Sequence, residues 1–124
     1  MSAATYNIKA DQGSTWNPTW THKDSAGALV DLTGYAARLQ VRESYASETV
    51  LLDLTTENGG ITLGGVAGTI APLATATQMA ALVVADAPGT PPARRCVYDF
   101  ELVLGAVVKR KLQGTFTVSR EVTR

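Results

Sequence analysis

The strongest constraint on the fold is a strict alternation of apolar and polar residues toward the end of the chain. Every second residue from Cys96 to Leu104 is apolar, and a second alternating run extends from Val108 to Val118. A period of two places successive side chains on opposite faces of a β-strand. We therefore expect two long antiparallel strands joined by a glycine-containing turn. The side chains expected to face inward are Cys96, Tyr98, Phe100, Leu102, Leu104, Val108, Leu112, Gly114, Phe116 and Val118.

The same alternation predicts how the two strands pair. Residues that face each other across an antiparallel ladder lie on the same face, so their numbers must both be even or both be odd. A loop of odd length over residues 104–106, closed by Val103 opposite Val107, meets this condition. It gives two opposite-charge pairs on the outer face, Glu101 with Lys109 and Asp99 with Lys111, each stabilising by about 0.2–1 kcal/mol. It also places Arg110 on the inward face, where its head must reach water or a partner.

The rest of the chain repeats the pattern in shorter segments. Alternating runs lie at residues 5–10, 15–21, 36–42, 50–55, 61–63 and 69–71, separated by turn signals at residues 23–30, 58–60 and 64–68. Pro18 has no backbone N–H, so its strand is expected at a sheet edge or a bulge. The pattern predicts an all-β fold, a small antiparallel β-sandwich with immunoglobulin-like or Greek-key connections, as a single domain over residues 1–124.

One short helix and one exposed loop complete the expected architecture. Thr75 stands three residues before Gln78, which is the spacing of a helix capping box. Residues 85–95 are rich in proline and have little to bury, so they are expected to form an exposed loop.

The charge balance excludes several classes of function. The chain has 124 residues, with 11 Lys plus Arg against 11 Asp plus Glu, so its formal net charge is zero. Binding of nucleic acid through bulk electrostatics needs an excess of Lys and Arg, so we expect no nucleic-acid partner. No run approaches the ~20 apolar residues that span a bilayer. No signal peptide is visible at the N-terminus, so we expect no membrane partner and folding in a cytoplasm.

Few residues could carry catalysis. One Cys and one His cannot form an internal disulfide or a usual zinc site. His22 is expected at the surface and Cys96 as an inert thiol in the core. Asp99 and Glu101 lie two apart on one strand face, which a glycosidase could use, but their expected lysine partners favour a structural role. We therefore expect a protein that is not an enzyme and that uses no metal or other cofactor.

Two segments supply candidate contacts with other proteins, because edge strands and loops are where a protein usually adds a neighbour. Trp16 and Trp20 share one face of a threonine-rich strand. They could belong to the core, anchor an interface or form a carbohydrate platform. The candidate contact residues are Trp16, Pro18, Trp20, Pro88, Pro91, Pro92, Arg94, Arg95 and Arg110.

Three segments in the first third of the chain carry a resemblance. They are Asp-Gln-Gly-Ser-Thr-Trp at residues 11–16, the turn at residues 23–27, and the block at residues 30–42, in which Asp31-Leu32-Thr33-Gly34 precedes a basic strand. With the later Thr-Ile strand, the short helix and the Tyr-Asp-Phe-Glu-Leu strand at residues 98–102, they resemble a small module of tailed-bacteriophage virion proteins. That module is the N-terminal domain of upper baseplate proteins in some siphophages, and it also occurs as free-standing small structural proteins.

The resemblance implies an assembly role without catalytic residues. The chain departs from that pattern in the inserted loop over residues 84–95, and we expect no receptor-binding or fibre domain after its last strand. We therefore expect a bacteriophage virion structural protein, assembled in the host cytoplasm in multiple copies on the tail, baseplate, neck or fibre attachment region. Its partners would be other phage structural proteins and copies of itself. Two alternatives stay open: a capsid decoration protein, and a carbohydrate-binding module for host surface polysaccharide.

Overall fold

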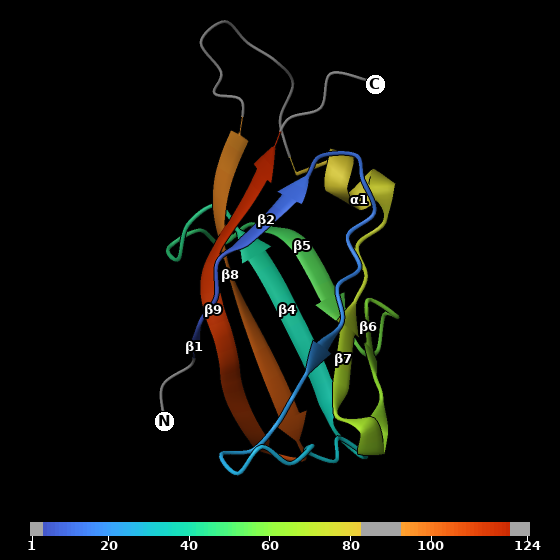
Figure 1. Cartoon of the computed structure of the whole chain (residues 1–124). Helices are drawn as coiled ribbons and strands as arrows, with labels where there is room; N and C mark the ends of the chain where they lie inside the picture. The colour runs from blue at the N-terminus through green and yellow to red at the C-terminus, as the bar shows by residue number, and fades with distance from the viewer. Residues whose placement is uncertain (1–3, 83–92, 120–124) are drawn as a thin grey trace, which may run out of the picture.

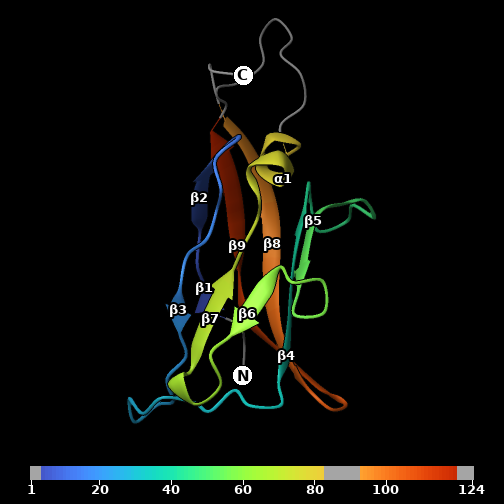
Figure 2. The same ribbon diagram turned by 90° about the vertical axis from the view of Figure 1, so that its right-hand side faces the viewer.

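The computed structural model describes residues 4–82 and 93–119 and consists of two β-sheets packed face to face (Figures 1 and 2). The large sheet has the order β1-β9-β8-β4-β5, with β2 also beside β9, and the small sheet has the order β3-β7-β6. The strands of the large sheet are β1 (Ala4–Thr5), β2 (Ile8–Asp11), β4 (Ala36–Arg42), β5 (Val50–Thr55), β8 (Ala93–Leu104) and β9 (Val107–Ser119). Those of the small sheet are β3 (Trp20–Thr21), β6 (Ile61–Leu63) and β7 (Thr69–Pro72). The predicted small β-sandwich is confirmed.

The core lies between the two sheets and follows the predicted alternation. The buried residues of β4 are Ala37, Leu39 and Val41, those of β8 are Cys96, Tyr98, Phe100 and Leu102, and those of β9 are Phe116 and Val118. The small sheet adds Ile61 and Ile70 from the other side. Leu104 and Val108 were also predicted to face inward, but each is 45% exposed. Leu104 lies at the end of the β8–β9 hairpin, which projects away from the small sheet (Figure 2). Val108 pairs with Val103 and therefore lies on the outer face of the sheet.

The N-terminal segment, predicted as one continuous strand, is divided into β1 and β2, and both run parallel to β9. The break falls at Tyr6 and Asn7, whose backbone passes directly over Gly114. Tyr98 donates its hydroxyl hydrogen bond to the Tyr6 carbonyl oxygen, and a backbone N–H of β9 donates to Asn7 Oδ1. These bonds replace part of the ladder at the break, and the Tyr6 side chain is 48% exposed instead of sharing the buried face with Ile8.

The predicted register of the β8–β9 hairpin is wrong at its tip. Leu104 pairs with Val107, so the turn contains only Gly105 and Ala106. Gly105 has a φ of 58°, while Ala106 does not have a positive φ. These are the signs of a type II′ turn, whose twist matches that of the flanking strands.

A β-bulge brings the rest of this hairpin back to the predicted faces. Glu101 pairs with Arg110, but the preceding residue, Phe100, pairs with Leu112. Lys111 therefore has no partner in the ladder and is the extra residue of the bulge. On the side of the bulge away from the turn, paired residues are both even or both odd, as in Phe100 with Leu112. Between the bulge and the turn, an odd residue pairs with an even one, because one extra residue reverses the faces of the strand.

The helix prediction is confirmed, and the loop prediction needs a correction. Helix α1 (Ala76–Ala80) begins after Thr75, whose side chain accepts a hydrogen bond from the Gln78 backbone, while the Gln78 side chain accepts one from the Thr75 backbone. A short 3₁₀ helix, η1 (Gly65–Ala67), forms the predicted turn before β7. The predicted loop at residues 85–95 ends too late, because β8 already begins at Ala93.

Candidate binding groove

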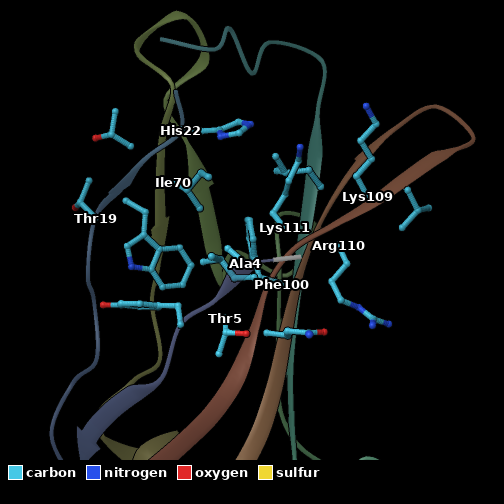
Figure 3. A pocket seen from close by; sticks show the side chains of 16 residues that line it. Ala4, Thr5, Thr19, His22, Ile70, Phe100, Lys109, Arg110 and Lys111 are labelled. Carbon is cyan, nitrogen blue, oxygen red and sulfur yellow. The ribbon is translucent and has the colours of Figure 1, made fainter. Parts of the chain in front are cut away.

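A groove with a volume of about 1350 Å³ lies between the small sheet and the β9 side of the large sheet (Figure 3). Its walls come from β1, from β3 with its flanking residues, and from residues 108–113 of β9. Ile70, Phe100 and Leu102 add apolar surface from the strands behind. Because β1 and β3 are each the outermost strand of their sheet, the groove lies where the two sheets are not joined by a shared strand.

Aromatic rings make up one wall. The Trp20 ring lies 6.2 Å from Tyr6, 6.1 Å from Trp16 and 5.6 Å from Phe100, each in an edge-to-face arrangement. Trp16 continues the cluster to Phe116 at 5.1 Å. Such pairs each stabilise by about 0.5–1.5 kcal/mol beyond the burial of their surface. Both tryptophans are half-buried and pack against the core, and Trp20 also lines the groove.

Cationic side chains make up the other wall. Lys109 and Lys111 of β9 lie on this side, and His22 approaches from the end of β3 (Figure 3). None of the described residues that line the groove is Asp or Glu. Burial lowers the pKa of His22 from its ordinary 6.5, and the Lys111 ammonium lowers it further. The groove therefore brings like charges together without a carboxylate among its described lining residues.

The bulge determines which cation faces which side of the sheet. Arg110 is on the face of its pairing partner Glu101, and its Nε lies 3.3 Å from Asp99 Oδ2. Lys109 pairs with the buried Leu102 and so lies on the groove side. The sequence had predicted the reverse, with Arg110 inward and the lysines outward.

Asp99 and Glu101 on the outer face each have an arginine as their partner instead of the predicted lysine. Arg38 Nε lies 2.7 Å from Glu101 Oε1, and Arg110 reaches Asp99. Burial raises the pKa of Asp99, the neighbouring Glu101 raises it further, and the guanidinium groups nearby oppose the shift. The ion pairs of Asp99 and Glu101 fit a structural role for these two carboxylates.

The predicted contact residues do not form one site. Trp16, Pro18 and Trp20 are half-buried along and before β3. Arg94 and Arg95 lie in β8, opposite residues 118 and 117 of β9, and not in a loop. The remaining candidates Pro88, Pro91 and Pro92 lie outside the described residues.

Sequence reasoning missed three residues of the groove: His22, Lys109 and Lys111. His22 was predicted at the surface, but it is half-buried. The signal for it was present, because His22 has the same strand parity as Trp16 and Trp20. The two lysines required knowledge of the bulge.

Other chemical features bear on function. Cys96 is buried, as predicted. Within residues 4–82 and 93–119, no three His, Cys, Asp or Glu side chains are grouped so that they could hold a metal ion. Over the same ranges, no helix has the length and apolar character needed to cross a membrane.

Comparison with known protein-family models and with curated proteins finds no match to this chain.

Proposed function

We propose that this chain is a non-enzymatic structural protein of a bacteriophage virion, assembled in multiple copies on the tail, baseplate, neck or fibre attachment region. The virion assignment is supported by the resemblance of the Asp-Leu-Thr-Gly block and the strand after it, which forms β4 with alternate residues buried. The assembly role is supported by an exposed apolar surface on the described part of the chain.

That apolar surface is the observation that carries the proposal. Leu104 and Val107 pair with each other at the end of the β8–β9 hairpin, so they share one face, and they are 45% and 55% exposed. Val108, which is 45% exposed, pairs with Val103 and lies on the other face of the hairpin. The hairpin end projects from one end of the sandwich (Figure 2). Grouped exposed apolar side chains on a projecting element are typical of a protein–protein contact, because their burial against a neighbour is favourable.

The aromatic cluster favours this role over recognition of a polysaccharide. Trp20 has ring neighbours on Tyr6, Trp16 and Phe100, so much of its surface is already in contact with protein. Stacking on a sugar needs a free ring face. A capsid decoration protein remains the alternative within the same class, and the two differ in the symmetry of the particle position.

The test is to locate the chain in virions of the phage or induced prophage that encodes it. We expect its peptides in purified virions by mass spectrometry, and density at three-, six- or twelvefold positions in a particle reconstruction. Icosahedral positions would identify a decoration protein instead. Absence of the peptides from virions would refute the proposal.

A pair of variants tests the hairpin surface in the same particles. Val107→Asp should lower incorporation about tenfold or more, because a charge replaces an apolar contact at the interface. Val66→Asp is the matched control, since Val66 is 73% exposed on η1 and should incorporate normally. Equal incorporation of the two variants would exclude the hairpin end as the contact.

A further inference from the structure

The positive charge of the groove indicates that its ligand carries acidic groups. Lys109, Lys111 and His22 line it, while Arg110 directs its Nε to Asp99 on the other face. With no Asp or Glu in the described lining, these groups have no opposite charge within the groove. A ligand carrying carboxylates would supply that charge to Lys109 and Lys111.

The apolar wall indicates that the ligand also carries apolar groups. Trp20, Ile70 and Phe100 present carbon surface beside the cations. A ligand that fits both walls must offer apolar groups on one side and acidic groups on the other. An extended peptide in which acidic and apolar residues alternate does this, because successive side chains point to opposite faces.

The edges of the groove fit an extended backbone. β1 and β3 both line the groove, and each is the terminal strand of its sheet among the described strands. A terminal strand has unpaired backbone groups along one side, to which an added strand can bond. The volume of about 1350 Å³ also exceeds the roughly 300–1,000 Å³ of small-molecule sites, which favours a segment of chain.

We propose that this groove binds an acidic, extended peptide segment of a neighbouring protein. This rests on the proposed assembly function for the identity of the neighbour as a virion protein. The binding itself depends only on the groove.

The test measures binding of a fluorescein-labelled hexapeptide, Thr-Glu-Val-Glu-Val-Glu with blocked ends, to the purified full chain by fluorescence anisotropy. Thr-Gln-Val-Gln-Val-Gln is the neutral control peptide, and trigalacturonate is a non-peptide anion used as competitor. We expect the acidic peptide to bind, the neutral peptide to bind at least tenfold more weakly, and 500 mM salt to weaken binding relative to 50 mM.

Two matched variants locate the site. Lys111→Gln should weaken binding of the acidic peptide about fivefold, because it removes a charge from the groove. Lys9→Gln removes an exposed lysine of β2 that does not line the groove and should leave binding unchanged. Thermal unfolding of both variants checks that the fold is kept.

Several results would overturn the inference: no binding of the acidic peptide, equal binding of both peptides, equal losses in the two variants, or tighter binding of trigalacturonate than of the peptide. The peptide-binding test and the virion test can fail independently of each other. A chain found in virions that binds no acidic peptide would refute the groove inference alone, and a chain that binds the peptide but is absent from virions would refute the proposed function alone.

Discussion

Replacement of Gly114 by alanine should destabilise the sandwich through a collision with the N-terminal backbone. A Cβ at this position would lie 2.7 Å from the Tyr6 carbonyl oxygen, 2.7 Å from Asn7 Oδ1 and 3.1 Å from the Tyr6 carbonyl carbon. Carbon atoms in ordinary contact are about 3.5–4.0 Å from their neighbours. The segment between β1 and β2 must therefore move away from β9 by several tenths of an ångström or more.

The cost follows from the bonds that this movement strains. The Tyr98 hydroxyl donates to the Tyr6 carbonyl oxygen, and the Thr115 N–H donates to Asn7 Oδ1 at 3.1 Å. Each bond contributes about 0.5–1.5 kcal/mol net, and overpacking by one methyl group costs about 1–3 kcal/mol. We expect Gly114→Ala to lower the free energy of unfolding by about 2–4 kcal/mol, or roughly 10 °C in melting temperature.

Urea denaturation followed by tryptophan fluorescence measures the change, with Gly27→Ala as the control. Gly27 has a φ of 85° in an exposed turn with nothing within 4 Å, so alanine there meets only backbone strain of about 1–2 kcal/mol. The collision argument also predicts that Asn7→Ala costs less in the Gly114→Ala background than alone, since it removes one of the colliding atoms. If Gly114→Ala is no less stable than Gly27→Ala, the close approach does not limit this position and the reasoning fails.

Three further measurements test other parts of the structure. Thr75→Ala should lower the free energy of unfolding by about 1 kcal/mol, because it removes the capping box. Thr77→Ala, at an exposed helix position, should lower it much less, and equal losses would contradict the role of the cap. The pKa of His22, followed by NMR on the one histidine, should lie below 6.5 and should rise in Lys111→Gln while staying below 6.5, because burial remains. The stability contributed by the neutral His22 is therefore complete above pH 6.5 and is lost as the pH falls toward the folded-state pKa. If Lys111→Gln leaves the His22 pKa unchanged, the two side chains do not interact. Cys96 has no exposed surface, so its thiol should react with a disulfide reagent only as fast as the sandwich opens, and reaction at the rate of the unfolded chain would contradict its burial.

The sheet core could be predicted because burial on one face imposes a period of two. Leu39 and Val41 in β4, and Phe100 and Leu102 in β8, occupy alternate positions and are all buried. Where this constraint ends, prediction ended too. Leu104 continues the same alternation, but it lies at the projecting hairpin end and is 45% exposed.

The division between β1 and β2 could not be predicted from the N-terminal segment alone. The local pattern is continuous, and the break depends on Gly114, more than one hundred residues away in the chain. A residue without a side chain in a buried strand indicates that another backbone passes close by, but it does not say which one.

The groove could not be predicted from the sequence either, because it depends on contacts between distant segments of the chain. Its walls combine β1, β3 and β9, and the edge positions of β1 and β3 depend on the strand order and not on any local pattern. The candidate contact residues were selected from the sequence by their residue type. In the structure, the bulge determines which side chains of β9 face the groove. The bulge therefore accounts for the incorrect faces of Lys109 and Arg110, and the strand order accounts for the missed groove.

This dependence makes deletion of Lys111 a direct test of the bulge. Removal of that residue leaves Arg110 opposite Glu101 and Leu112 opposite Phe100, so no pair on either side changes. We expect the chain without Lys111 to fold, with a loss of no more than about 2 kcal/mol, and to bind the acidic peptide about fivefold more weakly, as Lys111→Gln does. Deletion of Thr115 is the control, because in the regular ladder it must move the buried Phe116 and Val118 to the other face, and we expect that chain not to fold. Thermal unfolding and amide NMR spectra distinguish the two, and equal damage from both deletions would show that Lys111 is a necessary member of the ladder instead of an insertion into it.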